Sequence, residues 1–190
     1  MKRIIIAMTV LSLCAAVALA QAPQGPPKPG AEQKRMTYFV GNWNSEGTMK
    51  ESPFGPAGSF SGSERTEWLT GGFFLVSHTT GKGPMGEMKG MAVMGYDREA
   101  KGYTYNEFDS MGQAMAAKGS VSGDTWTWTN DGKTPNGKAY KSRFIIKEVS
   151  PTSYTMKWEA AVGGGAMQTV MEGKATKAAS ASKTAAAPKK

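Results

Sequence analysis

Hydrophobic and polar residues alternate with a period of two along much of the chain. The clearest stretch runs from Tyr154 to Glu159, where tyrosine, methionine and tryptophan alternate with threonine, lysine and glutamate. Residues 140–147 and 125–129 repeat the pattern, the second with strict alternation of threonine and tryptophan. Because successive side chains of a β-strand point to opposite faces, this pattern predicts strands with one buried and one solvated face.

Similar short stretches recur along the chain, separated by glycine, asparagine, aspartate or serine residues. The central pair, within residues 90–111, predicts a β-hairpin with its turn at Asp97–Gly102. One short helix is expected at Ala31–Tyr38. The ten predicted strands are Trp43–Met49, Phe60–Leu69, Phe73–Thr80, Met91–Tyr96, Tyr103–Phe108, Gln113–Val121, Thr125–Thr129, Tyr140–Val149, Ser153–Ala160 and Ala166–Ala175.

Ten short amphipathic strands with almost no helix predict an all-β fold. In an open sheet such strands would leave two unpaired edges, and closure of the sheet removes both. We therefore predict an antiparallel up-and-down (meander) β-barrel of about ten strands with a short N-terminal helix. A two-sheet sandwich is the alternative, because it would show the same alternation.

The N-terminus has the pattern of an export signal. Lys2 and Arg3 precede an apolar run that ends at Ala18-Leu19-Ala20, a small-residue cleavage pattern. We predict a signal peptide at residues 1–20 and a mature protein that is periplasmic or secreted. A membrane anchor is the alternative, but the apolar run is short for a span, and we expect no membrane span after cleavage.

The remaining chain divides by composition into three parts. Residues 21–34 are a proline-rich linker, residues 35–177 suit one barrel domain, and residues 178–190 are an alanine- and lysine-rich tail of disordered composition. Cys14, the only cysteine, lies within the predicted signal. The mature protein can then form no disulfide, so its stability must come from an apolar core.

The net charge of +8 belongs to the two ends of the chain. Residues 35–173 contain equal numbers of acidic and basic residues. A nucleic-acid-binding module would carry a basic patch on the fold itself, so we predict no nucleic-acid partner. The basic tail could contact anionic envelope polymers, or it could be a solvated tail without a partner.

A barrel of this size can be filled by its own side chains or can hold one small ligand. The side chains predicted to point inward mix bulky aromatic groups with small or flexible ones, so the sequence leaves both outcomes open. The residues predicted to line a ligand-binding interior are Trp68, His78, Tyr105, Trp126, Trp128, Tyr154 and Trp158.

Four short motifs carry a family resemblance. They are Gly41-Asn42-Trp43, Gly71-Gly72-Phe73-Phe74-Leu75, Gly95-Tyr96-Asp97 and Asp109-Ser110-Met111-Gly112. In this order and spacing they resemble a bacterial, often exported family of the lipocalin-like (calycin) group, domain of unknown function 1579, over residues 36–177.

The resemblance implies a meander barrel in which Gly41 and Trp43 form a structural motif at the start of the first strand. Calycins at large bind small apolar molecules inside the barrel, so the resemblance implies a small apolar or amphipathic ligand. One departure is that lipocalin-like barrels commonly place an arginine over this tryptophan, whereas the last strand here offers Lys174 and Lys177. We therefore expect this end of the barrel to be sealed differently.

Two enzymatic arrangements were considered, and neither leads us to predict catalytic residues. Glu107 and Asp109 share one strand face about 7 Å apart, near the separation that carboxylate-pair hydrolases use. Solvent-facing carboxylates matched to nearby lysines are the other interpretation. His78 follows Ser77 on a strand, where neighbours point to opposite faces and cannot pair as base and nucleophile.

A methionine-based copper site is the remaining alternative to a ligand-binding barrel. Met85, Met88, Met91 and Met94 recur every third residue, and thioethers suit Cu(I). On a strand this spacing alternates faces, so Met88 and Met94 could converge while Met91 points away. Methionine also fills irregular barrel interiors. We accordingly predict no metal or cofactor, with Met85, Met88 and Met94 as the alternative metal ligands.

Overall fold

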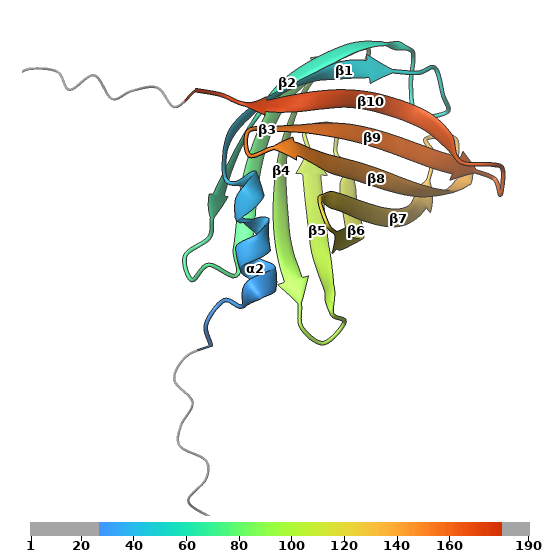
Figure 1. Cartoon of the computed structure of the whole chain (residues 1–190). Helices are drawn as coiled ribbons and strands as arrows, with labels where there is room; N and C mark the ends of the chain where they lie inside the picture. Colours follow the sequence, from blue (N-terminus) through green and yellow to red (C-terminus); the bar gives the residue numbers. More distant parts are fainter. Residues whose placement is uncertain (1–26, 180–190) are drawn as a thin grey trace, which may run out of the picture.

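The computed structural model describes residues 27–179, which form a ten-stranded antiparallel barrel with a short helical segment at its start (Figure 1). The predicted signal peptide, most of the predicted linker and the tail from residue 180 onward lie outside the described residues. Among residues 27–179, no helix has the length and apolar character needed to cross a membrane.

Each strand pairs with its neighbours in the chain, and the first pairs with the last, which closes the barrel. This confirms the predicted meander barrel and excludes the sandwich. The elements are α2 (Ala31–Arg35), the 3-10 helix η1 (Met36–Phe39), β1 (Gly41–Met49), β2 (Gly58–Trp68), β3 (Phe74–Gly83), β4 (Gly86–Asp97), β5 (Gly102–Asp109), β6 (Ala114–Ser122), β7 (Thr125–Lys133), β8 (Ala139–Ser150), β9 (Ser153–Val162) and β10 (Gln168–Lys177).

Strand β7 continues beyond the predicted strand Thr125–Thr129 and ends at Lys133. Asn130 to Lys133 pair with β8 although they include the turn formers Asn130, Asp131 and Gly132. The Tyr140 ring explains why residue 132 is a glycine, because a Cβ on Gly132 would lie 2.8 Å from the Tyr140 hydroxyl oxygen. Asn130 in turn donates a hydrogen bond to that hydroxyl at 3.2 Å. Pairing with a long neighbouring strand therefore overrides the local turn preference here.

The segment α2–η1 lies at the end of the barrel that carries the β4–β5 turn (Figure 1). Gln33 and Met36 are almost completely buried, and the Tyr103 hydroxyl of β5 donates to the Glu32 carbonyl. Residues 31–34 are thus part of the folded domain, so the predicted linker, 21–34, extends too far into the chain. Gly41 follows with a φ of +127°, a conformation that favours glycine at the start of β1.

The packed core lies at this helix-covered end, which we call the closed end. Its large buried side chains include Met36, Phe39, Trp43, Leu75, Met94, Tyr103, Trp126, Trp128, Ile146, Tyr154 and Met156. Toward the opposite end, which we call the open end, most inward-pointing side chains remain partly exposed. The barrel is therefore filled unevenly along its axis.

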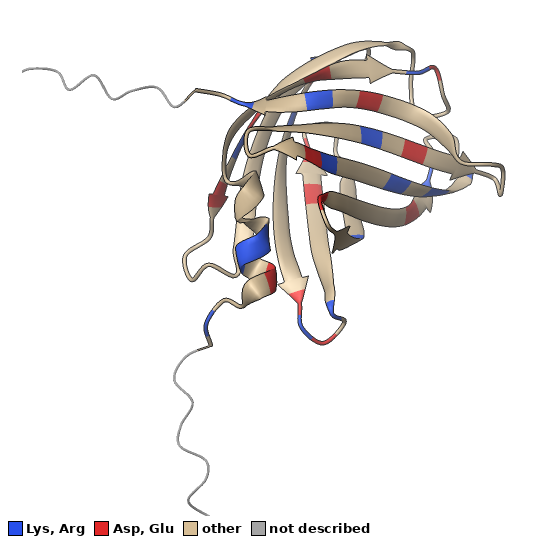
Figure 2. Cartoon of the chain, in the orientation of Figure 1, with Lys and Arg blue, Asp and Glu red and all other residues tan. Residues whose placement is uncertain are grey.

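On its outer face the barrel carries acidic and basic residues side by side. Figure 2 shows both charge types spread along β8, β9 and β10. Arg143 and Lys157 both pair with Glu159, and Lys174 pairs with Glu46. This distribution agrees with the balanced charge of residues 35–173 and gives no basic patch on these strands.

Candidate functional site

Trp43 and Lys177 seal the closed end together. Trp43 is 2% exposed, and its indole nitrogen donates to the Phe39 carbonyl at 2.8 Å. The Lys177 ammonium lies 5.0 Å from the Trp43 ring centroid, whereas Lys174 points outward to Glu46. A lysine thus provides a cation over the tryptophan, where lipocalin-like barrels commonly have an arginine.

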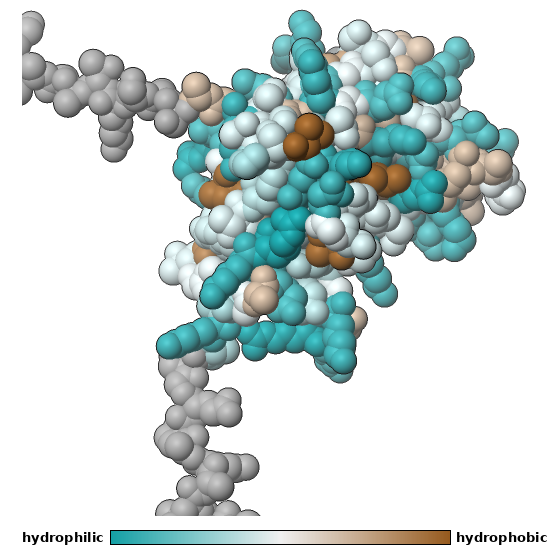
Figure 3. Space-filling model, in the orientation of Figure 1, coloured by the Kyte–Doolittle hydropathy of each residue, from teal (hydrophilic) through white to brown (hydrophobic). Residues whose placement is uncertain are grey.

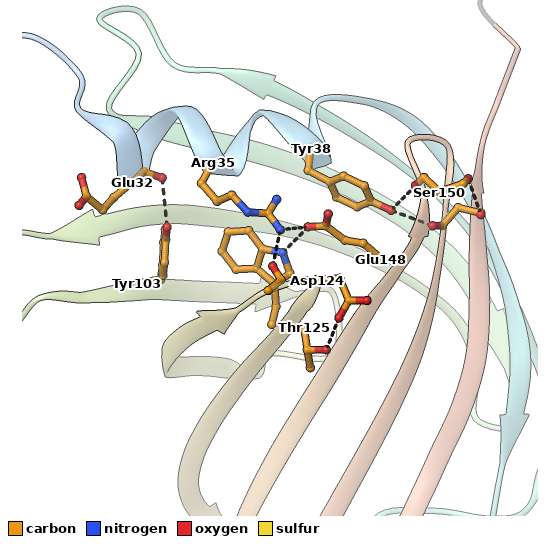
Figure 4. Close-up of polar contacts among 11 residues, drawn as sticks. Glu32, Arg35, Tyr38, Tyr103, Asp124, Thr125, Glu148 and Ser150 are labelled. Atoms are coloured by element: carbon orange, nitrogen blue, oxygen red, sulfur yellow. Dashed lines mark hydrogen bonds and ion pairs between the residues drawn. The ribbon is translucent and has the colours of Figure 1, made fainter.

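A second set of contacts fastens the helical segment to the barrel rim. In Figure 4, the Arg35 guanidinium lies 2.6 Å from a Glu148 carboxylate oxygen. The Trp126 indole nitrogen donates to the same oxygen at 2.7 Å, and the guanidinium lies 5.0 Å from the Trp126 ring centroid. Arg35 also donates to the Gly123 carbonyl in the β6–β7 turn. These charge-assisted contacts hold the helical segment across the barrel end.

Two tyrosines add hydroxyl donors to this closure. The Tyr38 hydroxyl lies 2.8 Å from the Ser153 carbonyl and 3.0 Å from the Ser150 carbonyl, at the β8–β9 turn (Figure 4). Burial and the nearby Glu148 carboxylate raise the pKa of Tyr38 to about 12. Tyr38 therefore keeps its proton and donates at any physiological pH. With both polar and apolar contacts in place, the closed end does not offer a ligand entrance.

Three of the predicted lining residues belong to the packed closed end. Trp126, Trp128 and Tyr154 are at most 8% exposed, and the two indoles stack with centroids 6.1 Å apart. They form the floor of the interior. Trp68, Tyr105 and Trp158 also point inward but remain partly exposed. The structure thus brings six of the seven predicted residues to the inner face, at different depths.

The seventh, His78, was assigned wrongly. Its side chain is exposed on the outside of β3, while its neighbour Ser77 is buried and lies 2.7 Å from the Thr66 hydroxyl. Because neighbouring residues of a strand point to opposite faces, Ser77 and His78 cannot both point into the barrel. His78 therefore belongs to the outer surface and cannot act on Ser77.

A polar cluster lies inside the barrel between the floor and the open end. Glu64 on β2 accepts a hydrogen bond from Thr66 at 2.6 Å, and Glu107 on β5 is half-buried. Burial raises the pKa of Glu107, the Glu64 and Asp109 carboxylates add to the rise, and the Tyr105 hydroxyl opposes it. The interpretation of Glu107 as a solvent-facing carboxylate is therefore wrong.

Asp109 has a structural role at the end of β5. One of its carboxylate oxygens accepts hydrogen bonds from the backbone N–H groups of Met111 and Gln113, both at 2.9 Å. These bonds close the β5–β6 turn. Because this oxygen is occupied by the turn, the structure does not favour the alternative in which Glu107 and Asp109 act as a hydrolase pair.

The predicted methionine ligands do not come together. Met88 and Met94 share the inner face of β4, but six residues of strand separate their Cα atoms by about 20 Å. Met85 lies in the β3–β4 turn and is 48% exposed. Within residues 27–179, no group of three His, Cys, Asp or Glu side chains is placed to hold a metal ion. The geometry therefore does not favour the copper alternative.

Phe54, which lies between the first two predicted strands, is placed over the open end of the barrel. It belongs to the β1–β2 connection, yet its ring packs against Trp158 at 4.8 Å and against Tyr140 at 5.0 Å, measured between centroids. Both partners are inward-pointing residues of β9 and β8. The one available sequence signal was an aromatic residue in a stretch otherwise made mostly of glycine, proline and polar residues. Phe54 thus covers part of the mouth of the barrel.

A groove also lies on the outer surface of the barrel. It is a shallow depression of about 730 Å³ on the outside of β10, β1, β2 and β3, lined mostly by exposed polar and charged residues such as Glu46, Ser61, Lys82 and Lys174. The face shown in Figure 3 is largely hydrophilic, with apolar residues in small separate patches. The inner face of the barrel is where apolar and polar groups converge.

Comparison with known proteins gives a family and a fold. The family model described as "Protein of unknown function (DUF1579)" matches residues 28–177. The crystal structure of Rv2717c from M. tuberculosis is similar, with a TM-score of 0.56 and 13% identity over 79% of this chain and 99% of that chain. The structure of EF1p2_mFAP2b bound to DFHBI matches with a TM-score of 0.42 and 10% identity over 77% of this chain and 98% of that one. No curated protein sequence matches significantly.

Proposed function

The chain belongs to the DUF1579 family of proteins of unknown function, and we propose that it is an exported, lipocalin-like protein that binds a small apolar or amphipathic molecule in the open half of its barrel. We propose binding rather than conversion, because Asp109 accepts the hydrogen bonds of the β5–β6 turn and His78 lies on the outer surface. The interior between the Trp126 and Trp128 floor and the Phe54 loop is the proposed site.

One observation carries the proposal. Large side chains that point into a closed barrel still have accessible surface in its open half. Close packing of the interior would bury such groups, so their exposure indicates space that the protein's own side chains do not fill. The inward-pointing, partly exposed residues include Met88, Tyr105, Met115, Tyr140, Phe144 and Trp158.

The chemistry of these walls suits an apolar or amphipathic ligand. Aromatic and methionine side chains supply most of the lining, and Glu64, Glu107 and Tyr105 supply a few polar groups. Small-molecule sites generally have this composition, in which apolar walls provide affinity and sparse polar groups set orientation. The Phe54 loop supplies an apolar cover that a ligand would have to displace or pass.

Filling the interior tests the proposal. Met115 points inward beside Glu107, whereas the next residue, Ala116, points outward and is exposed. Met115→Trp should weaken binding of the neutral fluorescent probe N-phenyl-naphthylamine by about tenfold or more, because the indole occupies the site. Ala116→Trp is the matched control and should bind like the parent protein. Equal binding by both variants, measured by calorimetry, would place the probe outside the barrel and contradict the proposal.

Export needs a separate test, because it rests on the N-terminal sequence. The intact mass of protein recovered from the producing bacterium's envelope or medium should correspond to a chain that begins at Gln21. Recovery of a chain that retains Met1–Ala20, in the cytoplasmic fraction alone, would refute export.

A further inference from the structure

The interior of the barrel is acidic on balance. Glu64 on β2 and Glu107 on β5 both point inward, from strands on different sides of β3 and β4. Neither carboxylate belongs to any ion pair found among residues 27–179. The two cations nearest the core, Arg35 and Lys177, lie at the closed end over Trp126 and Trp43.

The ionisable groups inside the barrel are close enough to affect one another. The Glu64 carboxylate raises the pKa of Glu107, Tyr105 and Tyr154, after the larger effect of burial in each case. No lysine, arginine or histidine lowers any of these pKa values. Side chains from β2, β5 and β9 thus share one space without a basic side chain to balance the carboxylates.

Tyr154 gives an independent sign of a missing partner. It is 8% exposed, and no hydrogen bond of its hydroxyl is found among residues 27–179. Because no buried side-chain oxygen or nitrogen in this range lacks a partner, the hydroxyl oxygen must keep some accessible surface. Burial raises its pKa far above the usual range, so the hydroxyl stays neutral. This accessible hydroxyl lies close enough to Glu64 for the carboxylate to raise its pKa, so it faces the same interior. A ligand that supplies a hydrogen-bonding group at this depth would satisfy it.

The surrounding rings suit a cation as well. Tyr105 and Trp128 lie with centroids 5.5 Å apart on the wall and floor of the interior, and the Tyr154 ring lies 4.9 Å from Trp43. The faces of such rings attract ammonium groups, most strongly where water is excluded. The interior therefore favours a cationic head group, because it contains carboxylates, a hydroxyl without a partner and aromatic ring faces.

We propose that the molecule bound in the barrel is a cationic amphiphile, whose ammonium group lies between Glu64, Glu107 and Tyr154 and whose apolar part extends toward Phe54 and the open end. This inference rests on the proposed function, because it specifies the ligand class of the same interior site. The ammonium would donate hydrogen bonds to the two carboxylates and to the Tyr154 oxygen. It would also provide the positive charge that the interior lacks.

Competition between ligands of one chain length tests the charge. Decylammonium, decanol and decanoate are titrated against bound N-phenyl-naphthylamine, using the full mature chain. Decylammonium should displace the probe at a concentration about tenfold lower than decanol, and decanoate should be the weakest competitor. Glu64→Gln and Glu107→Gln should each weaken decylammonium by about tenfold or more and leave decanol unchanged. Glu172→Gln, on the exposed face of β10, is the control and should change neither.

The outcomes separate the two proposals. Equal competition by decylammonium and decanol, with no effect of the two interior variants, would overturn the cationic head group and leave interior binding intact. Failure of the probe and of all three competitors to bind the parent protein would overturn both. Thermal denaturation of each variant shows whether it is folded, and the near-isosteric glutamines keep the interior volume constant.

Discussion

Gly119 allows the Trp128 indole to lie flat against β6. A Cβ at residue 119 would lie 2.9 Å from Cη2 of Trp128 and closer still to two further ring carbons. The usual separation of carbon atoms in contact is about 3.5–4.0 Å, so Gly119→Ala must displace the ring. The ring has little room to move, since it stacks on Trp126 and contacts Tyr105.

The size of the effect follows from two opposing contributions. Overpacking a tight core costs about 1–3 kcal/mol in free energy of unfolding. Replacing glycine by alanine within a strand returns about 0.5–1 kcal/mol, because the unfolded glycine has more freedom. The two ranges together allow about 0–2.5 kcal/mol. Because the Trp128 ring has little room to move, we expect Gly119→Ala to lower the free energy of unfolding by about 1–2 kcal/mol, which lowers Tm by about 2–8 °C for a domain of this size.

Thermal and urea denaturation measure this change, and near-ultraviolet circular dichroism reports the geometry of the indole pair. Gly102→Ala is the matched control, because its Cβ would lie no closer than 3.6 Å to any atom. It should leave Tm unchanged or raise it. A Gly119→Ala protein with the parent's Tm and the parent's circular dichroism would show that Trp128 does not lie over residue 119. In the Trp128→Leu background the same substitution should cost less, because the two residues are in contact.

Three further predictions test the closed end, the interior charge and the mouth. Arg35→Ala should lower the free energy of unfolding by about 1–3 kcal/mol in urea denaturation, because it leaves the Glu148 carboxylate without its cation. Arg65→Ala is the control and should change the free energy of unfolding little, because its partner Glu67 is exposed. Because the folded-state pKa of Glu107 is raised, its ionisation opposes folding as pH rises above 4.5. Glu107→Gln should therefore raise Tm at pH 7 and leave it unchanged well below pH 4.5, and a lower Tm at pH 7 would contradict the burial of this carboxylate. Phe54→Ala should speed both association and dissociation of N-phenyl-naphthylamine in stopped-flow fluorescence with only a small change in Tm, and unchanged rates would show that the loop does not cover the mouth.

Glu107 and His78 show where sequence reasoning stopped short. Tyr103, Tyr105 and Glu107 have the same strand parity, so alternation alone could have placed Glu107 inside once the tyrosines were inside. Glu107 was instead interpreted as solvent-facing because carboxylates are usually exposed, and this placed it on the wrong face of the strand. In β3, apolar residues occur at both parities, as in Phe74, Leu75 and Val76, so alternation did not identify the inner face there.

The amino-acid sequence by itself determined the ten strands and their order along the chain, because alternation of side chains is a local property of each strand. It favoured closure into a barrel, because unpaired edges are costly, but only the pairing of β1 with β10 excluded a sandwich. Alternation distinguishes inside from outside, but it says nothing about height along the barrel axis. Only the tertiary structure decided that Trp126 and Trp128 form a packed floor while Trp158 lines the open half beneath Phe54. That division depends on strand register and on contacts between residues far apart in the chain, and it leaves the side chains of the open half partly exposed.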